Sequence, residues 1–122
     1  MQRPVFFNIL QIQMPVGAIT SITHRISGIL LAIGIPFSIY LLDLSLDDPD
    51  GYQRANALLH SLPVRCLGIF FAWALGHHLL AGVRHLLSDI DIGSRLPGAR
   101  RSAWIVNCTS PLFAVLAAVA FL

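Results

Sequence analysis

Two adjacent histidines interrupt a long apolar run at 66–83, which reads CLGIFFAWALGHHLLAGV. Ionisable groups inside such a segment are uncommon, and they usually face a protein interior or a cavity. His78 is a candidate iron ligand, because axial histidine holds haem in many proteins. Gly82 lies one turn later on the same face and would leave room for a flat ring. The alternative for His78 is a hydrogen bond to a neighbouring helix.

The pair His77 and His78 can supply only one ligand to a given iron. Adjacent side chains on a helix point about 100° apart, so both imidazoles cannot reach one metal. No other apolar segment carries a histidine at this depth, since His24 and His85 lie at one edge and His60 lies at the other side. A six-coordinate haem at His78 would therefore need its second ligand from another chain.

A second polar cluster, Ser21, His24 and Arg25, precedes the first apolar segment. Spacings of three and four residues place all three on one helix face. We expect Arg84 and His85 at the same membrane level. Two arginines and two imidazoles there would suit haem propionates, or a quinone carbonyl that needs protons. The alternative for each arginine is a side chain that extends to the headgroups.

Asp89 follows this second pair and is a candidate for proton transfer. It comes four residues after His85, so we expect it near enough to pair with Arg84 or His85. The alternative is a solvated loop carboxylate.

The elements that must position these residues are membrane-spanning helices. Hydrophobic residues make up 56% of the 122 residues and charged residues only 11%, whereas soluble domains have about 25% charged residues. Three segments reach the roughly 20 residues that a span requires, at about 21–44, 64–87 and 103–122. We expect an all-α integral membrane protein with one membrane-anchor domain over 1–122. The net charge of +2 is too small to indicate nucleic-acid binding.

The arginines predict the orientation. They gather before the first span and between the second and third spans: Arg3, Arg25, Arg84, Arg95, Arg100 and Arg101. The connection between the first two spans is rich in Asp. By the positive-inside rule the N-terminus and the second connection are cytoplasmic.

Other features predict local structure. Pro15 could begin the first helix, and the apolar segment 5–13 is too short to span but could lie along the headgroups or a partner protein. The outer connection, 51–61, could form a short helix capped by Asp50. Gly68, Ala72 and Gly76 recur every four residues and predict close helix packing.

The two cysteines, Cys66 and Cys108, lie far apart in sequence, in or beside apolar segments. Small packing residues are the favoured interpretation of both side chains, over a disulfide or a metal pair.

Two motifs carry a resemblance to a known family: residues 21–28 read SITHRISG and residues 78–89 read HLLAGVRHLLSD. In this order and spacing they resemble the cytochrome b membrane-anchor subunit of succinate dehydrogenase (respiratory complex II). The opening Arg3-Pro4 and the three-span length also fit, so the resemblance covers nearly the whole chain.

The resemblance implies roles for individual residues. His78 matches the axial ligand of a b-type haem, while His77 matches nothing in the motif. Ser21 and Arg25 match positions that line the ubiquinone site. The polar edge around the haem propionates and the quinone pocket is matched by His24, Arg25, Arg84 and His85. Asp89 matches an acidic position close to that pocket.

The resemblance also implies partners. A second three-helix anchor subunit would supply the other haem histidine, and electrons would come from succinate through a flavoprotein subunit and an iron–sulfur subunit to ubiquinone. The expected location is the bacterial inner membrane, in the respiratory chain and the citric acid cycle. Two alternatives remain: an anchor of fumarate reductase, and a structural membrane subunit or small transporter subunit without a redox role.

Overall fold

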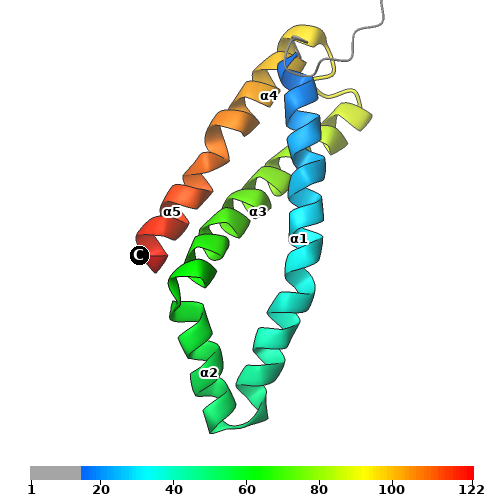
Figure 1. The fold of residues 1–122 in the computed structure, drawn as a ribbon. Helices are drawn as coiled ribbons and strands as arrows, with labels where there is room; N and C mark the ends of the chain where they lie inside the picture. Colours follow the sequence, from blue (N-terminus) through cyan, green and yellow to red (C-terminus); the bar gives the residue numbers. More distant parts are fainter. Residues whose placement is uncertain (1–14) are drawn as a thin grey trace, which may run out of the picture.

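The computed structural model describes residues 15–122, and all of its regular structure is helical (Figure 1). The helices are α1 (Val16–Asp47), α2 (Pro49–His60), α3 (Leu62–Asp89), α4 (Leu96–Thr109) and α5 (Pro111–Phe121). This confirms the all-α prediction for the described part of the chain. The segment 5–13, predicted to lie along the headgroups or a partner, falls outside the described residues.

Three helical stretches are long and apolar enough to cross a membrane, as predicted. They are α1, α3 and the combined stretch Leu96–Phe121. Ser110 keeps helical dihedral angles, φ −58° and ψ −35°, so α4 passes into α5 with little interruption. Pro111 is tolerated there because it begins α5, where its missing N–H needs no partner.

Both helix starts differ slightly from the sequence prediction. Pro15 lies just before α1, and its carbonyl accepts hydrogen bonds from the amides of Ala18 and Ile19 at 3.0 and 3.3 Å. The cap of α2 is Asp48, whose carboxylate accepts from the amide of Gly51. The prediction of Asp50 as the cap was wrong, because α2 begins earlier, at Pro49.

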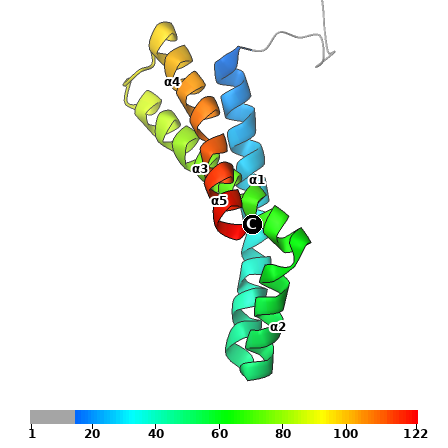
Figure 2. The same ribbon diagram turned by 90° about the vertical axis from the view of Figure 1, so that its left-hand side faces the viewer.

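The helix α3 lies at the centre of the bundle and contacts α1 on one side and α5 on another (Figures 1 and 2). The predicted stripe of small residues on α3 packs against α5. A Cβ on Gly76 would lie under 3 Å from the ring of Phe113, and one on Gly68 would lie 3.3 Å from Phe121. Close helix packing at these two glycines is therefore confirmed.

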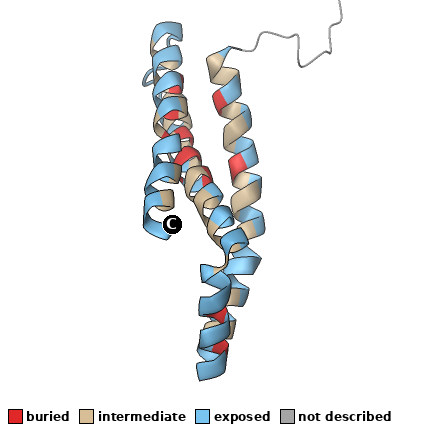
Figure 3. Cartoon of the chain, turned by 60° about the vertical axis from the view of Figure 1, so that its left-hand side comes forward, coloured by how far each residue is buried: buried red, intermediate tan, exposed pale blue. Residues whose placement is uncertain are grey.

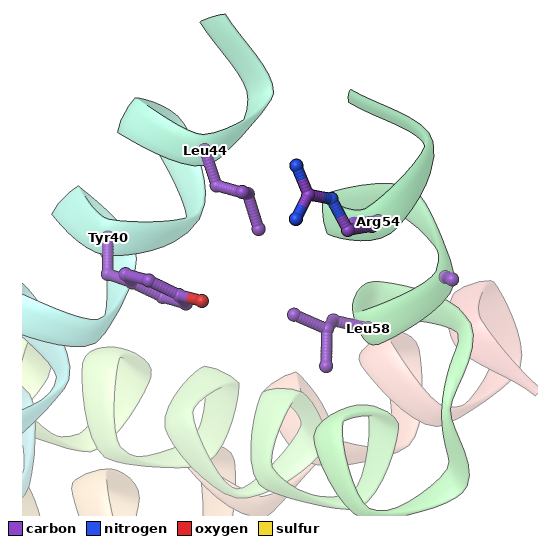
Figure 4. A pocket seen from close by; sticks show the side chains of 5 residues that line it. Tyr40, Leu44, Arg54 and Leu58 are labelled. Atoms are coloured by element: carbon purple, nitrogen blue, oxygen red, sulfur yellow. The ribbon is translucent and has the colours of Figure 1, made fainter. Parts of the chain in front are cut away.

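Beyond the three-helix contact, α1 continues and pairs with α2 alone (Figure 2). We call this hairpin, the end of α1 from Pro36 together with α2, the α1–α2 arm. A shallow pocket between its two helices is lined by Tyr40, Leu44, Arg54 and Leu58 (Figure 4). It lies at the opposite end of α1 from His24.

Few of the described residues are buried (Figure 3). The largest fully buried side chains among them are polar. The four largest fully buried side chains are His77, Thr20, Ser27 and Ser110. Large apolar side chains point outward instead, as a lipid-facing or partner-facing surface requires. Cys66 and Cys108 are both free and exposed on this chain. They therefore do not pack inside the bundle of this chain, although the sequence had predicted this for them.

Candidate functional site

Three imidazoles stack where α1 meets the last turns of α3. The ring of His24 lies parallel to that of His78, with centroids 4.2 Å apart and an angle of 11°. The ring of His24 also stacks on that of His85, with centroids 5.0 Å apart and an angle of 29°. The meeting of His24 with His85 agrees with the sequence prediction. The prediction that no other helix carries a histidine at the depth of His78 was wrong, because α1 brings the ring of His24 into contact with that of His78.

The two ring nitrogens of His78 have different surroundings. Nδ1 lies 3.1 Å from the carbonyl oxygen of His24 and 3.3 Å from the hydroxyl of Ser27. A carbonyl can only accept, so Nδ1 carries the proton and a neutral ring keeps its lone pair on Nε2. Ser27 donates to the same carbonyl, at 2.8 Å. Among the described residues, Nε2 of His78 has no hydrogen-bond partner.

A close approach by the backbone of α1 holds the ring of His78 in place. A Cβ on Gly28 would lie 2.9 Å from Cε1 of His78, so any larger residue would displace the ring. Gly82 was expected to leave room for a flat ring, but the side chain of His24 occupies the space beside it. A Cβ there would lie 3.5 Å from Nε2 of His24, an ordinary contact.

His77 is held by a separate set of groups. Its side chain is 2% exposed. Nε2 lies 2.7 Å from the hydroxyl of Thr23 on α1, and Nδ1 lies 3.1 Å from the hydroxyl of Ser110 between α4 and α5. Sequence reasoning missed both partners, which lie 54 and 33 residues away in the chain.

Ser21 and Arg25 lie near the start of α1, half-buried and exposed respectively. They share the helix with His24, which is three residues after Ser21 and adjacent to Arg25. The placement matches the predicted cluster at one end of the first span. It leaves the Arg25 guanidinium at the surface of the chain.

Arg84 points away from the histidine stack. Its Nε donates to the hydroxyl of Ser102 at 3.0 Å, and its Nη2 donates to the carbonyl of Ala99 at 3.2 Å. A Cβ on Gly17 would lie 3.5 Å from the same Nη2. Arg84 therefore joins α3 to the start of α4 and touches α1, rather than lying beside His24 and His85 as the sequence suggested.

Asp89 is exposed at the last residue of α3. Arg84 is bound to Ser102 and Ala99, and Nδ1 of His85 lies 2.6 Å from the carbonyl of Ala81. The described hydrogen bonds of these two side chains therefore do not include the pairing expected for Asp89.

Comparison with known proteins places this arrangement in a family. Residues 1–118 match the family model described as succinate dehydrogenase/fumarate reductase transmembrane subunit. The chain belongs to this family. Its three helical stretches that could cross a membrane agree with a transmembrane subunit of a bacterial inner membrane.

Similar proteins carry the name succinate dehydrogenase cytochrome b556 subunit. The protein from Coxiella burnetii is 34% identical over 97% of this chain and 95% of its own length. The one from Paracoccus denitrificans is 32% identical over 98% of this chain and 92% of its own length. A relative from Rickettsia felis is 27% identical over 94% of this chain and 90% of its own length. The chain is thus a succinate dehydrogenase cytochrome b subunit, a membrane anchor within an enzyme complex.

Proposed function

We propose that this anchor binds a b-type haem and ubiquinone near the cytoplasmic end of its helices. In this proposal it passes electrons from the iron–sulfur subunit of succinate dehydrogenase to quinone. The name of the relatives, cytochrome b556 subunit, supports the haem. The quinone proposal depends on Ser21, His24 and Arg25, which share the start of α1.

The observation that carries the haem proposal is the difference between the nitrogens of two neighbouring histidines. His78 uses Nδ1 for a backbone carbonyl and keeps Nε2 open. Haem- and metal-binding histidines commonly donate their second N–H to a carbonyl, which fixes the ring and its tautomer. His77 has hydroxyl groups on both nitrogens. This supports His78 as the iron ligand.

A second axial ligand would have to come from another chain. His24 is the imidazole that stacks most closely on His78 among the described residues. The two rings are stacked face to face and nearly parallel, with centroids 4.2 Å apart. That arrangement leaves no room for a porphyrin plane between them. We therefore propose a second anchor subunit as the donor, together with iron–sulfur and flavoprotein subunits as partners.

The haem would supply one-electron chemistry close to the quinone. On this chain, Ser21 would donate a hydrogen bond to a quinone carbonyl oxygen. Arg25 would stabilise the negative charge that develops as quinone accepts electrons. His24 and His85, whose rings lie 5.0 Å apart, would pass protons, because an imidazole can accept a proton on one ring nitrogen and donate one from the other. Asp89, exposed at the end of α3, would take protons from the cytoplasm.

The haem propionates would meet His24, Arg25 and His85 at this end of the bundle. Arg84 already donates from Nε to Ser102 and from Nη2 to Ala99, so only its remaining N–H groups would be available to a propionate. The proposed orientation, with the N-terminus and the α3–α4 connection in the cytoplasm, follows from the arginines. It puts this edge on the side where soluble subunits and protons are available.

The quinone assignment is tested with Ser21→Ala and Arg25→Leu in the purified complex. We expect both to abolish most quinone reduction and to keep succinate oxidation with an artificial acceptor. The acceptor takes electrons before they reach this subunit, so it serves as an internal control. Equal loss of both activities would contradict the assignment.

The haem assignment is tested with His78→Leu and, as a control, His60→Leu on α2. We expect the first to remove the low-spin b-type signal from the reduced-minus-oxidised spectrum and the second to leave it intact. An unchanged signal in His78→Leu would exclude this residue as the ligand.

A further inference from the structure

His77 is a buried polar side chain to which the proposed haem and quinone chemistry assigns no role. Its imidazole is 2% exposed and is one of the largest fully buried side chains in the described part of the chain. A buried polar group destabilises a fold unless it is hydrogen-bonded. The partners of His77 therefore indicate what the imidazole does.

The hydrogen bonds around His77 form a complete set. Thr23 Oγ1 lies 2.7 Å from the carbonyl of Ile19, to which it donates, so it can accept from Nε2–H of His77 at 2.7 Å. Ser110 can then donate to Nδ1 at 3.1 Å. In this assignment each ring nitrogen is paired, and His77 has the opposite tautomer to His78.

These bonds join three parts of the bundle through one ring. Thr23 belongs to α1, His77 to α3, and Ser110 to the junction of α4 and α5. The indole of Trp73, one turn earlier on α3, stacks against the imidazole with centroids 5.5 Å apart. Thr23 and Ser110, which belong to different neighbours of α3, thus hold the His77 side chain of that helix.

Holding His77 also fixes the direction of His78. Consecutive residues on a helix are separated by about 100° around its axis. Rotation of α3 would break the bonds of His77 at the same time as it moved Nδ1 of His78 away from the carbonyl of His24. The exposed apolar residues of α3 cannot supply the same control, because van der Waals contacts with lipid are similar at every rotation.

We propose that His77 is a positioning residue for the haem ligand. By bonding to Thr23 and Ser110 it sets the rotation of α3, so that Nε2 of His78 faces the partner anchor subunit. This inference rests on the proposed haem function of His78. It assigns to His77 a hydrogen-bonding role in place of iron binding.

The test compares His77→Phe with His77→Gln in the assembled complex. Phenylalanine keeps a ring of similar size but makes neither hydrogen bond. Glutamine can donate to Thr23 and accept from Ser110 through its amide. We expect His77→Phe to shift the low-spin haem signal in electron paramagnetic resonance and the haem midpoint potential. We expect His77→Gln to restore both toward wild type.

Two single-bond variants keep the test informative if His77→Phe does not assemble. Thr23→Val and Ser110→Ala each remove one partner of His77 and do not touch His78. Each should produce a smaller shift of the same sign as His77→Phe. Ser45→Ala, on the α1–α2 arm, is the matched control and should produce none, because its hydroxyl donates only to the carbonyl of Leu42 within α1.

The outcomes separate this inference from the proposed function. A wild-type complex without any b-type haem would contradict both proposals. Haem in the wild type, with unchanged signal and potential in His77→Phe, Thr23→Val and Ser110→Ala, would overturn the positioning role alone. Loss of the low-spin signal in His77→Gln as well as His77→Phe would instead make His77 the ligand.

Discussion

Two regions of this molecule are held together in different ways. In the part where α1, α3 and α4 meet, side chains form hydrogen bonds between helices, as His77 and Arg84 do. Thr20 adds another, to the amide oxygen of Asn107 at 3.1 Å. In the α1–α2 arm, the described side-chain hydrogen bonds stay within one helix or its cap. The contact between its helices comes from packing.

The difference indicates where this protein needs a defined geometry. Packing among apolar groups holds helices together but tolerates rotation and sliding, whereas a hydrogen bond has a direction. The hydrogen-bonded region contains His78 and the stacked imidazoles, whose proposed function requires fixed ring positions. The α1–α2 arm has no comparable requirement among its described residues.

The largest effect is expected from two glycines of α1 that both pack against α3, only one of them at His78. Gly28→Ala would place a Cβ 2.9 Å from Cε1 of His78, and Gly34→Ala would place one 2.7 Å from Cε1 of Phe71. Overpacking of this kind destabilises a fold by about 1–3 kcal/mol. We expect Gly28→Ala to lose more than half of the b-type signal, because the imidazole must move. Gly34→Ala should lower the thermal midpoint and keep the signal.

The two variants serve as controls for each other, since both press a methyl group against an aromatic ring. The measurements are the reduced-minus-oxidised spectrum and thermal unfolding of the complex. If Gly34→Ala lost as much haem as Gly28→Ala, then the haem site would depend on the general packing of α1 against α3 and not on the defined position of the His78 ring.

Arg84 gives an intermediate test. Removing its guanidinium in Arg84→Leu breaks the bonds to Ser102 and Ala99 and should destabilise the complex by about 1–3 kcal/mol. Ser102→Ala removes one of these acceptors and should cause a smaller loss. Thermal unfolding measures both. A change in haem midpoint potential as large as that in Arg25→Leu would instead return Arg84 to the propionate edge.

The smallest expected effect lies in the α1–α2 arm. Asp48→Ala removes the cap of α2 and should cost about 1 kcal/mol in local stability. Faster amide hydrogen exchange in α2 would report it, while quinone reduction and the haem spectrum stay at wild-type values. Asp50→Ala is the matched control, because Asp50 does not cap the helix. A loss of haem in Asp48→Ala would show that the arm and the haem region are coupled.

The sequence was sufficient to predict the spans, because length and apolar composition decide them. It also predicted the meeting of His24 with His85, since helical spacing and membrane level determine which residues face each other. It could not predict the direction of Arg84. A helix that is apolar on all sides carries little information about its rotation, and Ser102 lies on a helix whose packing position the motifs do not define.

The partners of His77 were hidden for a related reason. Thr23 and Ser110 are common residues in membrane helices, and a hydroxyl has no spacing pattern that identifies its partner. Only the crossing of three helices brings them to one imidazole. The hydrogen-bond partners of the ring nitrogens, which favour His78 over His77 as the iron ligand, are therefore visible only in the three-dimensional structure.

The length of α1 has a consequence for experiments in cells. Its 32 residues correspond to about 48 Å, whereas the hydrocarbon layer is about 30 Å thick. Spanning helices tilt by up to about 40°, and even that tilt leaves α1 too long to be immersed completely. The tip where α1 turns into α2 carries Asp47, Asp48 and Asp50, so water-soluble, membrane-impermeant labels should reach it. A short epitope inserted at that tip would report, in intact cells and in spheroplasts, which side of the membrane it occupies.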